Sequence, residues 1–253
     1  VNQCRLLERP VEYNIWRAPT DNDRYIKLKW QKAHYDITYS RAYQTDYSVT
    51  AEGVRIHSVL AILSPVIQRI LNMEAEWLIG ADGRVDVNLN VKRDTELPEL
   101  PRFGLRLFLP KDMEDVTYYG LGPVESYCDK RRASSHGTFT AHVTELHEDY
   151  IRPQENGSHD DCDFVSLAGR RAGLTAAGDK TFSFNASVYT QEELTEKDHN
   201  YELVRSPYTV LCLDYRMNGI GSNSCGPRLI EKYRLDEEEF SFGISLIPEV
   251  KAE

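Results

Sequence analysis

A nine-residue stretch, G-I-G-S-N-S-C-G-P (219–227), gathers residue types that could do chemistry at a protein surface. Glycine and proline adopt unusual backbone angles, and serine and asparagine hydrogen-bond locally, so the stretch predicts a loop between two strands. A thiol, Cys225, lies near its tip. A catalytic thiolate is the least favoured reading, because no histidine that could activate it lies close in the sequence.

Two carboxylates, Glu125 and Glu155, lie in polar segments rich in glycine and proline. Glycoside hydrolysis uses two carboxylates that flank the scissile bond. However, the chain has forty acidic residues, so chance pairs of carboxylates must occur. We therefore expect Glu125 and Glu155 to pair with an arginine or to accept backbone N–H bonds, and Arg131 and Arg152 are the nearby candidates.

No metal site or phosphate site is predicted. S-H-D-D-C-D (158–163) offers histidine and aspartate ligands, but consecutive aspartates are more typical of a solvated turn, and a calcium loop needs a fuller ligand pattern. The chain has no C-x-x-C and no H-E-x-x-H, and its glycine loop lacks the Lys-Ser/Thr ending of a phosphate-binding loop.

Composition excludes several classes of partner. The net charge of −10 argues against binding to nucleic acid or to an anionic membrane, and D-K-R-R (129–132) predicts a solvated face or an ion-pair network. The longest apolar run is too short to span a bilayer. Five scattered cysteines predict reduced thiols in the cytoplasm. Because the chain opens with Val and shows no signal peptide, we expect a piece of a longer protein.

Two short helices are expected. Ile26, Trp30 and Ala33 fall on one face of a helix within 24–35, and an acidic or amide residue at 21–23 could cap it. Thr190 and Glu193 have capping-box spacing at the start of the second, within 190–199.

The rest of the chain reads as strands. Alternation on both sides of Gly53 and of Asp82-Gly83 predicts two hairpins, and further strands are expected at 103–110, 182–189, 209–217 and 240–248. More than ten strands with two short helices predict an all-β fold, with residues 1–253 forming one large antiparallel sandwich. A two-domain split is less favoured, since the most linker-like stretch, 94–102, is short.

Four motifs carry a family resemblance. They are W-R-A-P-T-D-N-D (16–23), Y-Y-G-L-G-P-V-E-S-Y-C-D-K-R (118–131), Y-I-R-P-Q-E-N-G-S-H-D-D (150–161) and the segment 199–227, which ends in the glycine loop. In this order they resemble the C-terminal domain of the bacterial β-galactosidases of glycoside hydrolase family 2. The resemblance runs from Trp16 to Pro248.

The resemblance implies a β supersandwich of the galactose mutarotase type. It also implies that catalysis and active-site shaping belong to different domains. The catalytic glutamates, with the divalent and monovalent metals, belong to a (β/α)₈ barrel that precedes this domain. This chain would then hold no catalytic residue and no cofactor, and would be inactive alone. Its partners would be the remaining domains of the same β-galactosidase and a galactoside at the shared site.

The family loop reads G-x-G-G-D-D-S-W, and its tryptophan is a platform for the sugar. Here the loop is one residue shorter and Cys225 stands at the tryptophan position. The platform is therefore lost, supplied by another residue, or replaced by a different aglycone site. Asn223 and Ser224 could hydrogen-bond a sugar hydroxyl, whereas Cys225 could equally be a small residue that holds the loop against the barrel.

The remaining motif residues receive structural roles, at the domain interface or in anchoring loops: Trp16, Arg17, Asp21, Glu125, Glu155 and Asn156. Trp16 is expected in the core or on the barrel, and Arg17 in a buried polar network with nearby acids.

Two other functions stay open. A stand-alone aldose epimerase would need a carboxylate base and a histidine in one groove, for example Glu125 and His136. A carbohydrate-binding module would need a strip of exposed aromatic residues, whereas alternation within strands favours burial for most of the fifteen tyrosines.

Overall fold

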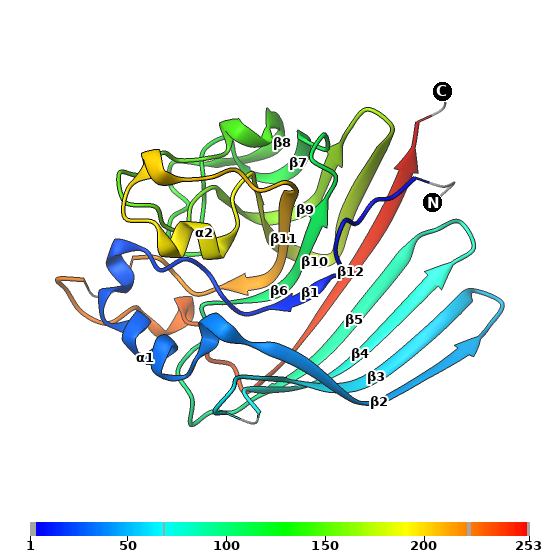
Figure 1. Cartoon of the computed structure of the whole chain (residues 1–253), viewed down its shortest axis with the longest axis horizontal. Coiled ribbons are helices and arrows are strands. Elements are labelled where there is room, and N and C mark those ends of the chain that lie inside the picture. Colours follow the sequence, from blue (N-terminus) through cyan, green and yellow to red (C-terminus); the bar gives the residue numbers. More distant parts are fainter. Residues whose placement is uncertain (1–3, 68, 222–223, 252–253) are drawn as a thin grey trace.

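The computed structural model describes residues 4–67, 69–221 and 224–251, which form twelve strands and two short α-helices (Figure 1). The strands are β1 (Glu12–Asn14), β2 (Tyr39–Val49), β3 (Gly53–Leu63), β4 (Leu71–Gly80), β5 (Val85–Arg93), β6 (Arg102–Leu109), β7 (Asp115–Gly122), β8 (Ser135–His142), β9 (Ser158–Ala168), β10 (Ala172–Ser187), β11 (Thr209–Met217) and β12 (Glu239–Val250). The helices are α1 (Ile26–Lys32) and α2 (Gln191–Glu196). The predicted all-β antiparallel class is confirmed.

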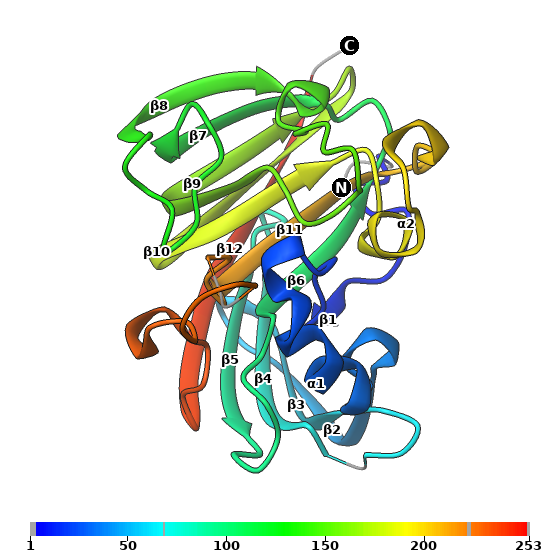
Figure 2. The same ribbon diagram turned by 90° about the vertical axis from the view of Figure 1, so that its left-hand side faces the viewer.

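All strand pairs are antiparallel, and the sheet forks at β10. The first half of β10 pairs with β12, from Ala172 opposite Val250 onward, and the second half pairs with β11, from Ser183 opposite Asp214 onward. One branch continues from β12 through β5, β4 and β3 to β2, and the other from β11 through β6 to β1. The other edge of β10 carries β9, β7 and β8. Figure 2 shows β7–β9 at one end and β2–β5 at the other.

The two branches face each other across one apolar core. Phe103 of β6 packs edge-on against Phe240 of β12, with ring centroids 5.0 Å apart. Where the branches meet again, Trp77 of β4 donates from Nε1 to the Tyr13 hydroxyl of β1 at 3.2 Å. One buried cluster contains residues from both branches, which is the arrangement of a sandwich. The assignment of 1–253 as one excised domain stays a prediction.

The first helix has the predicted face but not the predicted cap. Ile26, Trp30 and Ala33 are all buried, as their spacing requires. The N-cap is Tyr25, whose side chain makes no capping bond, so the expectation that a residue at 21–23 caps this helix is wrong. Residues 21–24 instead form a 3₁₀ turn of their own, and the side chains of Asp21, Asn22 and Asp23 bond to Gln154, Ile220 and Arg17.

The second helix has half of its predicted capping box. The Thr190 hydroxyl accepts a bond from the Glu193 N–H at 3.2 Å. The Glu193 carboxylate instead accepts the N–H of Val204 at 2.8 Å, so it ties a following loop to the helix.

Both predicted hairpins are confirmed. Gly53 and Gly83 have φ angles of +147° and +88°, which glycine adopts readily. A side chain at Gly53 would also collide with the Ile79 carbonyl, at 2.1 Å.

One expectation about loops is wrong, and one is supported. Residues 158–163 do not form a turn, because they begin strand β9, with Asp161 in the left-handed region (φ 58°) at an irregularity of the ladder. The stretch 94–102, already disfavoured as a linker, packs on the fold, because the Trp30 indole donates to the Glu99 carbonyl at 2.7 Å and Leu100 is buried. Tertiary contacts therefore order segments that look polar and irregular in the sequence.

Tyrosine burial is less complete than predicted. Seven tyrosines are exposed, including three on β2, whose every residue is exposed: Tyr25, Tyr39, Tyr43, Tyr47, Tyr119, Tyr150 and Tyr201. Strand β2 lies at the edge of the sheet with both faces exposed, so its alternating pattern does not mark a core face. Within the described segments, neither helix has the length and apolar character that crossing a membrane requires.

Candidate functional site

The glycine loop follows β11 and lies at the same end of the molecule as α1 and α2 (Figure 1). Its tip borders an open groove of about 440 Å³, whose lining includes Asn22, Asp129, Ser224, Cys225 and Tyr233. The Ser224 hydroxyl donates to Asn22 Oδ1 at 3.1 Å, and Cys225 is exposed. Asn223 lies outside the described residues.

Asp129 clamps the start of this loop. Its Oδ1 accepts the N–H of Ile220 at 3.0 Å, and its Oδ2 accepts the N–H of Gly221 at 2.7 Å. A Cβ at Gly219 or Gly221 would lie 2.7 or 3.0 Å from the same carboxylate oxygen. The glycines are therefore needed because the carboxylate lies directly against their backbone. Asn22 adds a third tie, since its amide donates to the Ile220 carbonyl at 3.0 Å.

Arg17 holds the base of the loop from beneath. It is fully buried, and its Nη2 donates to both Asp23 oxygens, at 2.8 and 3.1 Å. The same guanidinium donates to the backbone carbonyls of Asn218 and Gly219, at the point where the chain leaves β11. The predicted buried network of Arg17 with nearby acids is therefore present, and it anchors the candidate loop.

A second buried network supports the neighbouring strands. Arg102 bonds through two nitrogens to Asp214 and approaches Glu155 at 3.4 Å, and all three side chains are buried. Burial raises the pKa of Glu155, and the Arg102 guanidinium opposes that rise. The prediction that Glu155 pairs with an arginine is confirmed, but the arginine is Arg102. The candidate Arg152 instead pairs with Asp198 on the surface.

Glu125 is a structural anchor with no free oxygen lone pair aimed at a ligand. Its carboxylate accepts bonds from Lys130, from the hydroxyls of Tyr127 and Tyr150, and from the Gly157 N–H. Burial alone raises the pKa of Glu125, but these bonds outweigh burial and lower it. The predicted backbone bond is confirmed, whereas the partner cation is Lys130. The other candidate, Arg131, pairs with Asp161.

The other predicted residues join the motifs to one another. Asp21 and Gln154 exchange two hydrogen bonds, at 3.0 and 3.2 Å, which link the first motif to the third. Asn156 is buried and accepts the Glu148 N–H through Oδ1 at 3.0 Å. Trp16 lies in the core, 6.4 Å from Trp30 in an edge-on contact, and donates to Thr195.

The sequence analysis singled out the segments that hold the loop but missed the Asp129 clamp. The sequence shows Asp129 only as part of a charged run, and the ion pairs predicted for that run are present at Lys130 and Arg131. No local pattern reveals this clamp, because Asp129 lies about ninety residues before the two N–H groups that it accepts. Among the described residues, no three His, Cys, Asp or Glu side chains converge to hold a metal ion.

Comparison with known proteins places this arrangement in a family. The family model for the β-galactosidase small chain matches residues 1–246. The chain belongs to the β-galactosidase small-chain family. The resemblance inferred from the four motifs is thereby confirmed.

Whole β-galactosidases are similar to this small-chain member along nearly its full length. The β-galactosidase of Actinobacillus pleuropneumoniae is 47% identical over 242 residues, which is 96% of this chain and 24% of that protein. The β-galactosidase of Staphylococcus xylosus is 40% identical over 246 residues, again 96% of this chain and 24% of that protein. The chain therefore spans about a quarter of the length of these relatives.

Among solved structures, the galactose 1-epimerase of Lactobacillus acidophilus NCFM matches with a TM-score of 0.44 and 9% identity, over 83% of this chain and 67% of that one. A galactose mutarotase-like protein from Lactobacillus casei ATCC 334 gives 0.43 and 11%, over 83% and 74%.

Proposed function

We propose that this chain is the C-terminal part of a β-galactosidase of glycoside hydrolase family 2, and that it forms one wall of the active-site entrance. The observation that carries the proposal is the glycine loop. Two separate sequence motifs hold it, the first through Arg17 and Asn22 and the second through Asp129, while Ser224 and Cys225 line an open groove. Such anchoring orders a loop whose tip must contact a ligand in a site that another domain partly forms.

The end of the molecule that carries the loop also suits a domain interface. Tyr25, Leu28 and Ile230 are 52%, 59% and 62% exposed, on segments beside the loop. Exposed apolar side chains of this size mark interaction surfaces when they gather at one place. Since relatives are about four times longer, the remaining domains of the same polypeptide are the occupant that we propose for this surface.

The catalytic carboxylates and metals of the proposed enzyme belong to those other domains. In this chain Glu125 accepts four hydrogen bonds and Glu155 is buried beside Arg102, so neither is available as a nucleophile or a base. This also argues against the epimerase alternative, which would need Glu125 free. We propose that the chain is inactive alone and works in the cytoplasm on a neutral galactoside.

Complementation tests the proposal. The purified chain is mixed with the barrel-containing remainder of the protein, and hydrolysis of a chromogenic β-galactoside is followed, with each piece alone as a control. We expect activity only in the mixture. A remainder that is equally active without the chain would refute the proposed wall.

A matched pair of variants separates the loop from mere association of the pieces. Asp129→Ala removes the clamp, whereas Asp163→Ala removes an exposed carboxylate that lies 3.9 Å from its nearest ionic partner, His136. We expect the mixture containing Asp129→Ala to lose activity and the mixture containing Asp163→Ala to keep it.

A further inference from the structure

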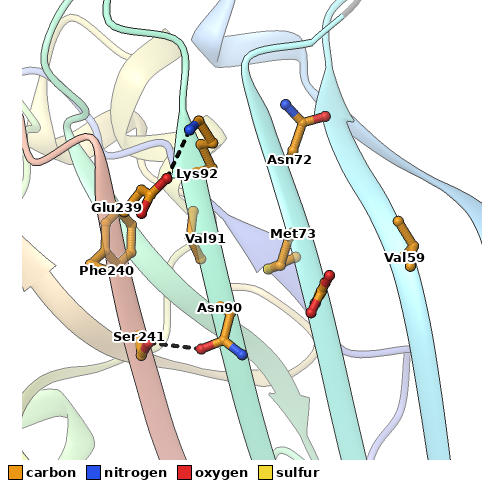
Figure 3. A pocket seen from close by; sticks show the side chains of 10 residues that line it. Val59, Asn72, Met73, Asn90, Val91, Lys92, Glu239, Phe240 and Ser241 are labelled. Atoms are coloured by element: carbon orange, nitrogen blue, oxygen red, sulfur yellow. Dashed lines mark hydrogen bonds and ion pairs between the residues drawn. The ribbon is translucent and has the colours of Figure 1, made fainter.

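We propose that the outer face of β4, β5 and β12 is a second carbohydrate site, which takes a neutral oligosaccharide. A trough of about 540 Å³ lies on this face, and Figure 3 shows its side chains projecting from neighbouring strands. An adjoining hollow of about 210 Å³ shares Asn90 and Ser241 with it. Neither hollow shares a lining residue with the groove at the glycine loop.

The strand register arranges the polar side chains of the trough in rows. Asn72, Lys92 and Glu239 lie opposite one another in the first row. Glu74, Asn90 and Ser241 form the second row. In the third row Asn88 lies opposite Gly243, where a Cβ would come within 3.0 Å of the Asn88 oxygen and 2.7 Å of an Asp179 oxygen. Glycine at this position therefore lets the Asn88 and Asp179 side chains lie directly against the β12 backbone.

Several hydrogen-bonding groups on this face are uncommitted. Asn90 accepts a bond from Ser241 at 2.7 Å through its oxygen, which leaves its amide N–H groups free. The side chains of Asn72, Asn88 and Glu74 make no hydrogen bond within the described protein, and all three are exposed. Asparagine is disfavoured in strands, so three of them on one face of two neighbouring strands run against local propensity. Such departures concentrate at functional sites.

The charges define the class of ligand. Lys92 is neutralised by Glu239 at 2.8 Å and by Glu238 at 3.5 Å. Glu74 has no cationic partner among the described residues, so the trough is neutral to negative and disfavours phosphate, sulfate or uronate groups. Amides donate and accept at once, which suits the vicinal hydroxyls of a neutral sugar. The choice of a galactoside as the probe rests on the proposed function.

Titration of the 253-residue chain with β-1,4-galactotetraose, followed by ¹⁵N NMR, tests the site. The side-chain amide signals of Asn72, Asn88 and Asn90 report binding directly. We expect them to shift, with a dissociation constant in the millimolar range, because the trough is open and its polar side chains are exposed to water. Asn88→Ala and Asn90→Ala should each weaken binding roughly fivefold, which is the loss of one hydrogen bond. The control Ser48→Ala, on the edge strand β2, should leave binding unchanged.

Three results would overturn the site: no shift up to about 10 mM sugar, equal binding of tetragalacturonate, or unchanged affinity in both asparagine variants. The complementation assay keeps this test separate from that of the proposed function. Asn88→Ala and Asn90→Ala should retain hydrolysis of a small chromogenic galactoside, because they lie outside the groove at the glycine loop.

Discussion

Replacing Asp129 by alanine removes two hydrogen bonds that hold the glycine loop, one to the Ile220 N–H and one to the Gly221 N–H. A hydrogen bond to a charged group contributes about 1.5–3 kcal/mol. Asp129 is half-exposed, so water competes, and we expect the pair together to stabilise the loop by about 2 kcal/mol. That value corresponds to a roughly 30-fold change in the equilibrium between the ordered and the open loop.

Amide hydrogen exchange measured by NMR gives this equilibrium directly, because each of the two N–H groups exchanges from the open loop. We expect exchange of Ile220 and Gly221 to accelerate roughly 30-fold in Asp129→Ala, while amides in β11 keep their rates. Asp163→Ala is the matched control and should change neither. Unchanged exchange at both positions would refute the clamp, and acceleration throughout the chain would show a loss of overall stability instead.

Three further predictions concern the loop tip and the buried charges. Cys225→Trp places an aromatic face at an exposed position. The complemented enzyme should then show a KM for a galactoside that is roughly two- to tenfold lower, with an unchanged Tm of the chain. An unchanged KM would argue that this position does not contact the sugar. Arg102→Met leaves Asp214 and Glu155 buried without a countercharge and should lower the free energy of unfolding by about 3–5 kcal/mol in urea titrations, whereas Arg5→Met on the surface should cost little. Burial lowers the pKa of His159 to about 4, so between that pH and about 6.5 the unfolded chain binds a proton that the folded chain excludes. The free energy of unfolding should therefore fall by about 3 kcal/mol as pH decreases from about 6.5 to 4. His159→Gln should flatten that part of the stability profile, and a profile identical to the parent would contradict this account.

Local patterns were sufficient for the elements whose pattern and burial agree. The two hairpins need only a glycine at the turn and alternation beside it, and both form where the sequence predicts them. The buried face of α1 also follows from spacing alone. Strands β7 and β8 gave no such signal, because Gly120 and Gly122 lie within β7 and β8 is largely exposed. Gly120 is required by close approach to Cys162, not by a turn.

The sequence by itself determined the family and the all-β class, because those properties depend on residue types in order along the chain. Only the tertiary structure decided which partners the buried charges take. Glu125 pairs with Lys130 instead of Arg131, and Glu155 with Arg102, 53 residues away, instead of Arg152. Proximity along the chain favours neighbours, but a buried carboxylate is stabilised by whichever cation the packed strands bring beside it.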